Sequence, residues 1–176
     1  MKKLSALGLG FALVASLGAG AAFAAPGPYE TEVTLVADSD QLDVTVTTTI
    51  AGAITGDGSI TYPTNAAIIN NSVFAVHVSA ITATQASPFN LVANSAYAGS
   101  SANNALWSTV KTDITGATAF DFGGNSGFVQ ADWNMTAASG ADKDLALTFA
   151  GAIKNLNPLP TTATKAYDIV WTVTAG

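Results

Sequence analysis

QLDVTVTTTI, residues 41–50, is the stretch that decides the fold class. Its apolar residues Leu42, Val44 and Val46 alternate with Asp43 and with threonines, so an extended chain here has one apolar and one polar face. The β-branched residues that dominate the stretch also favour a strand over a helix. The pattern therefore predicts a half-buried strand of an antiparallel sheet.

The same alternation recurs on both sides of this stretch. Glycine, proline and asparagine turns separate the runs, and the chain after residue 24 shows no helical periodicity. About nine or ten strands of this kind predict an all-β fold, an antiparallel two-sheet β-sandwich of jelly-roll or immunoglobulin-like type. Further strands are expected at residues 30–35, 74–78, 129–135, 145–149 and 167–173, and weaker ones at 59–62, 89–93 and 106–114.

The first 24 residues have the three parts of a bacterial secretory signal peptide. Lys2 and Lys3 form a positive start, residues 4–18 are uncharged and mostly apolar, and Ala22 and Ala24 suit a signal peptidase. We expect cleavage before Ala25, one domain over residues 25–176, and an extracellular location at the cell surface or cell wall. The chain has no cysteine, so neither a lipid-modified cysteine nor a disulfide is available to it.

The charge of the expected mature chain excludes two classes of partner. Residues 25–176 contain twelve acidic residues against four lysines and no arginine, a net charge of −8. Nucleic acids and anionic membrane surfaces would be repelled, since both require clustered Lys or Arg. After leader cleavage we therefore predict no nucleic-acid partner and no membrane contact. The four lysines are Lys111, Lys143, Lys154 and Lys165.

Candidate catalytic groups are few. The single histidine, His77, lies in mid-strand opposite an apolar row and is best interpreted as an ordinary strand residue. A carboxylate pair of the kind used in glycoside hydrolysis would have to come from Asp113, Asp121 and Asp132, and Asp132 is expected on a solvent face. We therefore predict no enzymatic activity, no catalytic residue and no cofactor.

Asp38, Asp40 and Asp43 resemble the beginning of a calcium-binding loop, in which carboxylates at alternate positions converge on one cation. The resemblance stops there, because the sixth position is not glycine and the twelfth, Thr49, is not glutamate. A polar hairpin turn between two strands is the favoured interpretation, and no metal is expected.

The three tryptophans are expected in two settings. Trp133 and Trp171 are in phase with apolar neighbours and are predicted to lie in the core. Trp107 is out of phase with Leu106 and Val110 and is a candidate exposed aromatic residue, of the kind that stacks against sugars.

The end of the chain resembles the last strand of WxL domains, secreted β-rich modules that bind Gram-positive cell walls non-covalently. Trp171 and Val173 match the Trp-x-Leu motif with valine in place of leucine, and Phe89 and Leu91 match an upstream copy with phenylalanine in place of tryptophan. The resemblance implies a non-catalytic surface protein that binds a cell-wall polymer or scaffolds other surface proteins, with these four residues as its binding motif.

The chain also resembles the camelysin and biofilm-matrix fibre proteins, which are exported, cysteine-free β-proteins. This second resemblance implies a structural subunit that polymerises outside the cell by donating an N-terminal strand to the open sheet edge of a neighbour. The candidate donor strand consists of Glu30, Thr31, Glu32, Val33, Thr34, Leu35, Val36 and Ala37.

Overall fold

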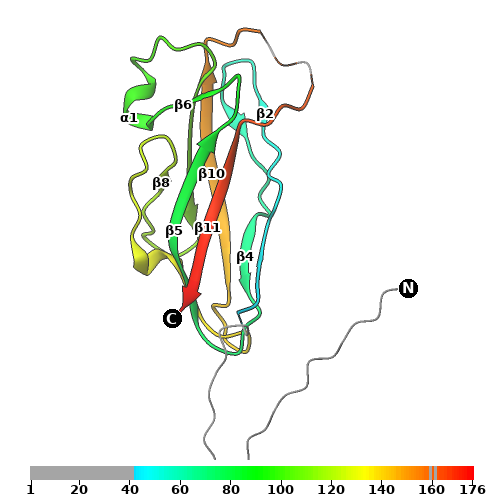
Figure 1. Cartoon of the computed structure of the whole chain (residues 1–176), viewed down its shortest axis with the longest axis vertical. Coiled ribbons are helices and arrows are strands. Elements are labelled where there is room, and N and C mark those ends of the chain that lie inside the picture. Colours follow the sequence, from blue (N-terminus) through cyan, green and yellow to red (C-terminus); the bar gives the residue numbers. More distant parts are fainter. Residues whose placement is uncertain (1–41, 159, 161) are drawn as a thin grey trace, which may run out of the picture. The chain divides into compact units, whose positions relative to one another are not determined.

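The computed structural model describes residues 42–158, 160 and 162–176, and these residues form an all-β fold (Figure 1). Two short helices interrupt the strands, α1 (Asn94–Tyr97) and the 3-10 helix η2 (Gln130–Trp133), and neither has the length or apolarity needed to cross a membrane. The strands are β1 (Val44–Val46), β2 (Ala53–Ile54), β3 (Ile60–Thr61), β4 (Ala67–Asn70), β5 (Val76–Gln85), β6 (Asn90–Leu91), β7 (Ala105–Thr112), β8 (Phe120–Asp121), β9 (Asn134–Met135), β10 (Asp144–Lys154) and β11 (Tyr167–Ala175).

The largest sheet has six strands in the order β1-β4-β10-β7-β6, with β8 also paired to β7. Its pairs are antiparallel except for β6, which lies parallel to β7. The alternation predicted for residues 145–149 is confirmed in β10, where Leu145, Leu147 and Phe149 are buried and the residues between them are exposed. One face of this sheet therefore packs on the core, and the other meets solvent.

A second sheet has three strands in the order β11-β5-β9. β11 and β5 pair along nearly their whole lengths, with a register shift between Thr172 and Val173. A third unit, the β2–β3 hairpin, attaches to the end of β10 through a bridge between Ser59 and Ala152. In Figure 1, β5 and β11 lie side by side, and β11 descends to the C-terminus.

One large buried cluster contains residues from both of the larger sheets. Ile68 and Leu147 come from the six-stranded sheet, whereas Val78 and Met135 come from the three-stranded sheet. Trp133 lies in the same cluster and is completely buried, which confirms its predicted place in the core. A smaller cluster consists of Phe89, Leu106 and Ile153.

The strand predicted at residues 41–50 is shorter than expected, and Gln41 lies outside the described residues. β1 covers only Val44–Val46, and Thr47–Ile50 have no strand pairing. β1 is short because the strand that it pairs with, β4, is itself only four residues long. Periodicity alone does not reveal how far a neighbouring strand extends.

The strand predicted at residues 129–135 is wrong for most of its length. Residues 130–133 form η2, and only Asn134–Met135 pair as a strand. Specific hydrogen bonds hold the turn, because Thr112 Oγ1 donates to the carbonyl of Asp132 (2.8 Å) and the Thr118 amide donates to the Asp132 carboxylate (2.8 Å). Val129 and Ala131, which the alternation placed inside, are exposed.

Candidate functional site

The most distinctive surface feature is a groove lined by β11 and by the chain that follows β1. Within the described residues, β1 pairs only with β4, and β11 pairs only with β5. Among these residues, each strand therefore leaves one row of backbone N–H and C=O groups without a strand partner. Edges of this kind are templates for pairing with another strand.

Burial along the strands shows that the core is incompletely covered at these edges. On β10, Leu145 and Leu147 are only 2% and 3% exposed. On β11, the inward residues Tyr167, Ile169, Trp171 and Val173 are all half-buried, although they pack against the same large cluster. On β1, Val44 and Val46 are likewise half-buried members of that cluster.

The groove has a volume of about 1480 Å³ and a mainly apolar lining. Its walls come from the residues that follow β1, from the β2–β3 hairpin and from β11 with the segment before it. Lys154 and Lys165 are also in the lining. The apolar part of the lining includes Val46, Ile50, Tyr62, Ile153, Ile169 and Trp171.

Three hydroxyl groups lie beside the groove and join its walls. Ser108 Oγ is 3.1 Å from Tyr62 Oη and 2.8 Å from Tyr167 Oη, and Ser108 is completely buried. Burial raises the pKa of Tyr167 well above its usual range, with a smaller contribution from Tyr62. The group therefore stays neutral and links β7 to β11 by hydrogen bonds, which is a structural role.

The four residues of the WxL-like motif take different positions. Phe89 is buried in the smaller cluster, and Leu91 packs half-buried between the two clusters. Trp171 was predicted to be a core residue and is instead half-buried, with its ring 5.7 Å from that of Trp133. Phe89 and Trp171 both line the groove, whereas Val173 is half-buried on the inner face of β11.

Trp107, the candidate exposed aromatic residue, is half-buried. Its ring meets that of Tyr97 edge-on at 6.3 Å, and Lys154 Nζ lies 4.9 Å from the centre of the Tyr97 ring. Lys154 Nζ also donates to the carbonyl of Ala98 (2.8 Å). Through these contacts, Trp107 and Lys154 hold α1 and the residue after it against the sheet.

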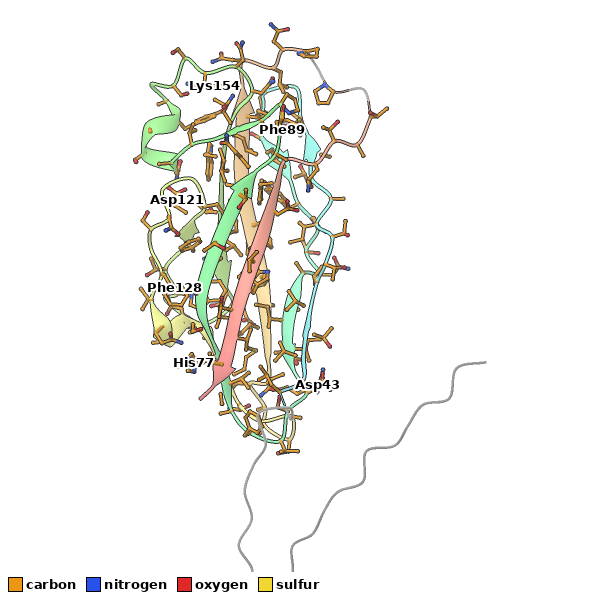
Figure 2. All side chains as sticks on the ribbon, viewed as in Figure 1. Asp43, His77, Phe89, Asp121, Phe128 and Lys154 are labelled. Carbon is orange, nitrogen blue, oxygen red and sulfur yellow. The ribbon has the colours of Figure 1, made fainter. Side chains whose placement is uncertain are left out.

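The candidate catalytic groups are all engaged in local structure. Figure 2 shows His77 and Asp43 near one end of the domain, and Phe89 and Lys154 near the other. The ring of His77 contacts Thr174 on β11 (Nε2 to Oγ1, 2.9 Å). Asp121 accepts hydrogen bonds from the amides of Asn94, Gly123 and Gly124, and Asp113 accepts one from Ala146.

The predicted calcium cluster and donor strand fall mostly or wholly outside the described residues. Asp38 and Asp40 lie there, as do all residues from Glu30 to Ala37. Asp43 is described, and its carboxylate accepts a hydrogen bond from Asn71 Nδ2 (3.3 Å). In the part of the chain that is described, no three acidic or histidine side chains form a group suited to a metal ion.

Sequence reasoning missed the groove as a site. Alternation identifies the inward faces of β1 and β11 but not the order of strands, so it cannot show that both are edges. The comparisons with known proteins do not supply this information, because no protein-family model, curated protein or solved structure matches the chain.

Proposed function

We propose that this chain is a secreted, non-catalytic β-sandwich protein that serves as a structural subunit of an extracellular fibre or matrix. In this proposal each subunit receives a strand from a neighbouring copy in the groove between β1 and β11, and donates its own N-terminal strand in turn. The observation that supports it is one apolar groove lined by β11 and by the end of β1, two strands that each pair with a single other strand among the described residues.

An uncovered strand edge is unfavourable because its backbone N–H and C=O groups have no strand partner and can pair with another chain. Stable proteins usually protect long edges with charges, prolines or bulges. β11 is nine residues long, carries a single charged residue, Asp168, and departs from regular pairing only near its end, between Thr172 and Val173. An added strand would satisfy its backbone groups and cover Ile169 and Trp171, which are only half-buried.

Electron microscopy of the purified protein, after negative staining, tests this proposal. We expect ordered filaments from the exported wild-type protein, and none from a variant that lacks residues 25–37. Filaments that persist in the deletion variant, or wild-type protein that stays monomeric at every concentration, would contradict the proposal.

A matched pair of substitutions on β11 tests the groove itself. Ile169→Asp places a charge on the inner face of β11, whereas Val170→Asp places the same charge on the adjacent outer position, which is 58% exposed. We expect Ile169→Asp to abolish filament growth and Val170→Asp to permit it. Circular dichroism of both variants checks that each remains folded, and equal growth of the two would count against the groove.

Attachment to the cell wall, as implied by the WxL-like motif, is the second candidate function. It is favoured by one observation, that the aromatic residues of both motif copies, Phe89 and Trp171, line the same groove. A wall-binding protein would sediment with purified peptidoglycan as a monomer and would lose this property in Trp171→Ala. Absence of sedimentation would remove this candidate.

A further inference from the structure

The segment around β9 contains an acceptor sequence for an N-linked sugar. Residues 134–136 are Asn-Met-Thr, an Asn-x-Thr tripeptide of the kind that carries sugars on the surface of exported proteins. In bacteria this acceptor sequence extends to an acidic residue two positions before the asparagine, and Asp132 occupies that position. One other Asn-x-Ser/Thr tripeptide occurs in the chain, at residues 70–72, and Ile68 stands two positions before it.

The tripeptide at residues 70–72 is unsuited to carry a sugar in the folded protein. Asn70 is completely buried, and its Nδ2 donates hydrogen bonds to the carbonyls of Phe74 and Thr136. A sugar on that nitrogen would remove at least one of these bonds and place a bulky polar group in the core. The structure therefore leaves residues 134–136 as the candidate.

Asn134 presents its side chain at the surface. It is exposed at the start of β9, where its backbone is extended with φ −89° and ψ 140°, and it pairs with His77, which Figure 2 labels near one end of the domain. Side chains alternate along an extended chain, and accordingly Asn134 and Thr136 are exposed whereas Met135 between them is buried. The carboxamide and the hydroxyl group of the acceptor tripeptide are thus both accessible.

Asn134 also lines a hollow that could receive the first sugar. The hollow has a volume of about 620 Å³, and its polar lining includes Asp113, Asp142, Thr115 and Thr136. Carboxylate and hydroxyl oxygens accept hydrogen bonds from sugar hydroxyl groups. Among the described residues, none that lines this hollow also lines the groove, so a sugar here leaves the groove accessible.

We propose that Asn134 is the acceptor of an N-linked oligosaccharide, transferred from a polyprenyl pyrophosphate donor once the chain has crossed the membrane. In this transfer Nδ2 of Asn134 forms a bond to the anomeric carbon of the first sugar, and the bond between that carbon and the pyrophosphate oxygen breaks. The amide nitrogen gives up one proton, and the polyprenyl pyrophosphate leaves. The inference rests on the export that the proposed function includes, and it does not depend on fibre formation.

Mass spectrometry of the exported chain tests the proposal. The full chain is produced in a bacterial host that carries an oligosaccharyltransferase and its lipid-linked oligosaccharide, together with an established acceptor protein as positive control. We expect the mass of the oligosaccharide on the tryptic peptide of residues 112–143, and fragmentation should place it on Asn134. An unmodified peptide beside a modified control protein, or a sugar on Asn125 instead, would overturn the proposal.

Two matched pairs of variants test the acceptor sequence. Thr136→Ser should keep the sugar, whereas Thr136→Val, which has nearly the same shape but no hydroxyl group, should lose it completely. Asp132→Asn should also lose it, whereas Asp142→Asn, which changes the charge equally in the lining of the hollow, should keep it. The oxygen of an asparagine at position 132 can still accept from the Thr118 amide, and circular dichroism checks that each variant is folded. A sugar that persists in Thr136→Val would contradict the proposal.

Leader cleavage separates this inference from the proposed function. A chain that loses its leader and carries no sugar would remove the glycan site and leave the fibre. A chain that keeps its leader and carries no sugar would remove both, because both require export. A glycosylated protein that never forms filaments would leave the glycan site and remove the fibre.

Discussion

Asn70 shows how much of this disulfide-free domain depends on single buried polar residues. Its Nδ2 donates to the carbonyls of Phe74 (2.8 Å) and Thr136 (2.7 Å), and its Oδ1 accepts from the amide of Ser72 (2.9 Å). Asn70 is completely buried, so no water replaces these bonds when the side chain is removed. The side chain therefore ties β4 to two connecting segments.

We predict that Asn70→Ala lowers the free energy of unfolding by about 2 to 4 kcal/mol, because three backbone groups lose a hydrogen-bond partner that is completely buried. Urea denaturation followed by circular dichroism would measure this loss. The neighbouring variant Asn71→Ala is the control, since Asn71 is exposed and bonds only to Asp43 and Thr45 through its side chain. A loss in the control as large as that in Asn70→Ala would show that burial is not the cause.

Asp57 provides a prediction of pH dependence. The hydroxyl of Thr55 and then the amide of Ser59 donate to its carboxylate, and these bonds hold the pKa of Asp57 below its ordinary value of 3.8. Because the folded pKa is the lower one, the turn is stabilised above pH 3.8 and loses that contribution as the pH falls through the folded pKa.

We predict that Thr55→Val raises the pKa of Asp57 toward 3.8, as measured by carbon NMR of the carboxyl group during an acid titration. Thr61→Val, on the exposed strand β3 of the same hairpin, should leave the titration unchanged. An unshifted curve in Thr55→Val would show that the hydroxyl is not the main cause.

At the scale of elements, the β2–β3 hairpin depends on one glycine. Gly58 has φ +87°, and a Cβ there would lie 2.3 Å from the carbonyl oxygen of Ile153. Its own carbonyl accepts a hydrogen bond from the amide of Ile153 (2.8 Å). The hairpin, which forms one wall of the groove, can therefore reach β10 only with glycine at this position.

We predict that Gly58→Ala detaches the hairpin from β10 and lowers the free energy of unfolding by about 1 to 3 kcal/mol. Hydrogen exchange of the Ile153 amide should accelerate, while amides in the middle of β7 stay protected. Gly56→Ala is the matched control, because nothing lies within 4 Å of its added carbon and its φ is not positive. Unchanged exchange at Ile153 in Gly58→Ala would contradict this account.

The element scale also shows where sequence reasoning succeeds and fails. The strands β10 and β11 are predictable because each pairs along most of its length with one partner, so burial follows the period of two over residues 144–149 and 167–173. Only the beginning of β5, Val76–Gln85, is predicted, because its burial departs from that period after Ser79. Residues 129–135 show the same period and yet form η2, because hydrogen bonds from Thr112 and Thr118 hold Asp132 in a turn. These are long-range partners that no local pattern reveals.

The half-burial of Trp171 also depends on long-range contacts that no local sequence pattern reveals. Its phase correctly places it on the inward face of β11, but its exposure depends on whether another strand covers that edge. Strand order is a property of the whole sheet, and the order β11-β5-β9 is what leaves β11 with one strand partner among the described residues. The candidate site could not have been predicted from the sequence for this reason.

At the scale of the whole molecule, charge opposes any assembly of this protein. Residues 25–176 carry a net charge of −8, so in the proposed fibre neighbouring subunits would repel each other even if a strand of one fits the groove of the next. The Debye length is about 30 Å at 0.01 M salt and about 8 Å at 0.15 M. Repulsion between whole subunits acts over the longer range, whereas contacts between a strand and its groove act at short range.

We therefore predict that raising sodium chloride from about 10 mM to about 150 mM shortens the lag and lowers the critical concentration of filament growth, as followed by light scattering. Sodium sulfate at the same ionic strength should have a closely similar effect if screening is the cause, and a larger one if salting-out dominates. Slower growth in salt would instead mean that attraction between Glu30 or Glu32 and the lysines of the groove controls the rate. In that case Lys165→Gln, which removes a groove charge, should slow growth at low salt, whereas Lys143→Gln, which changes the net charge equally outside the groove lining, should not.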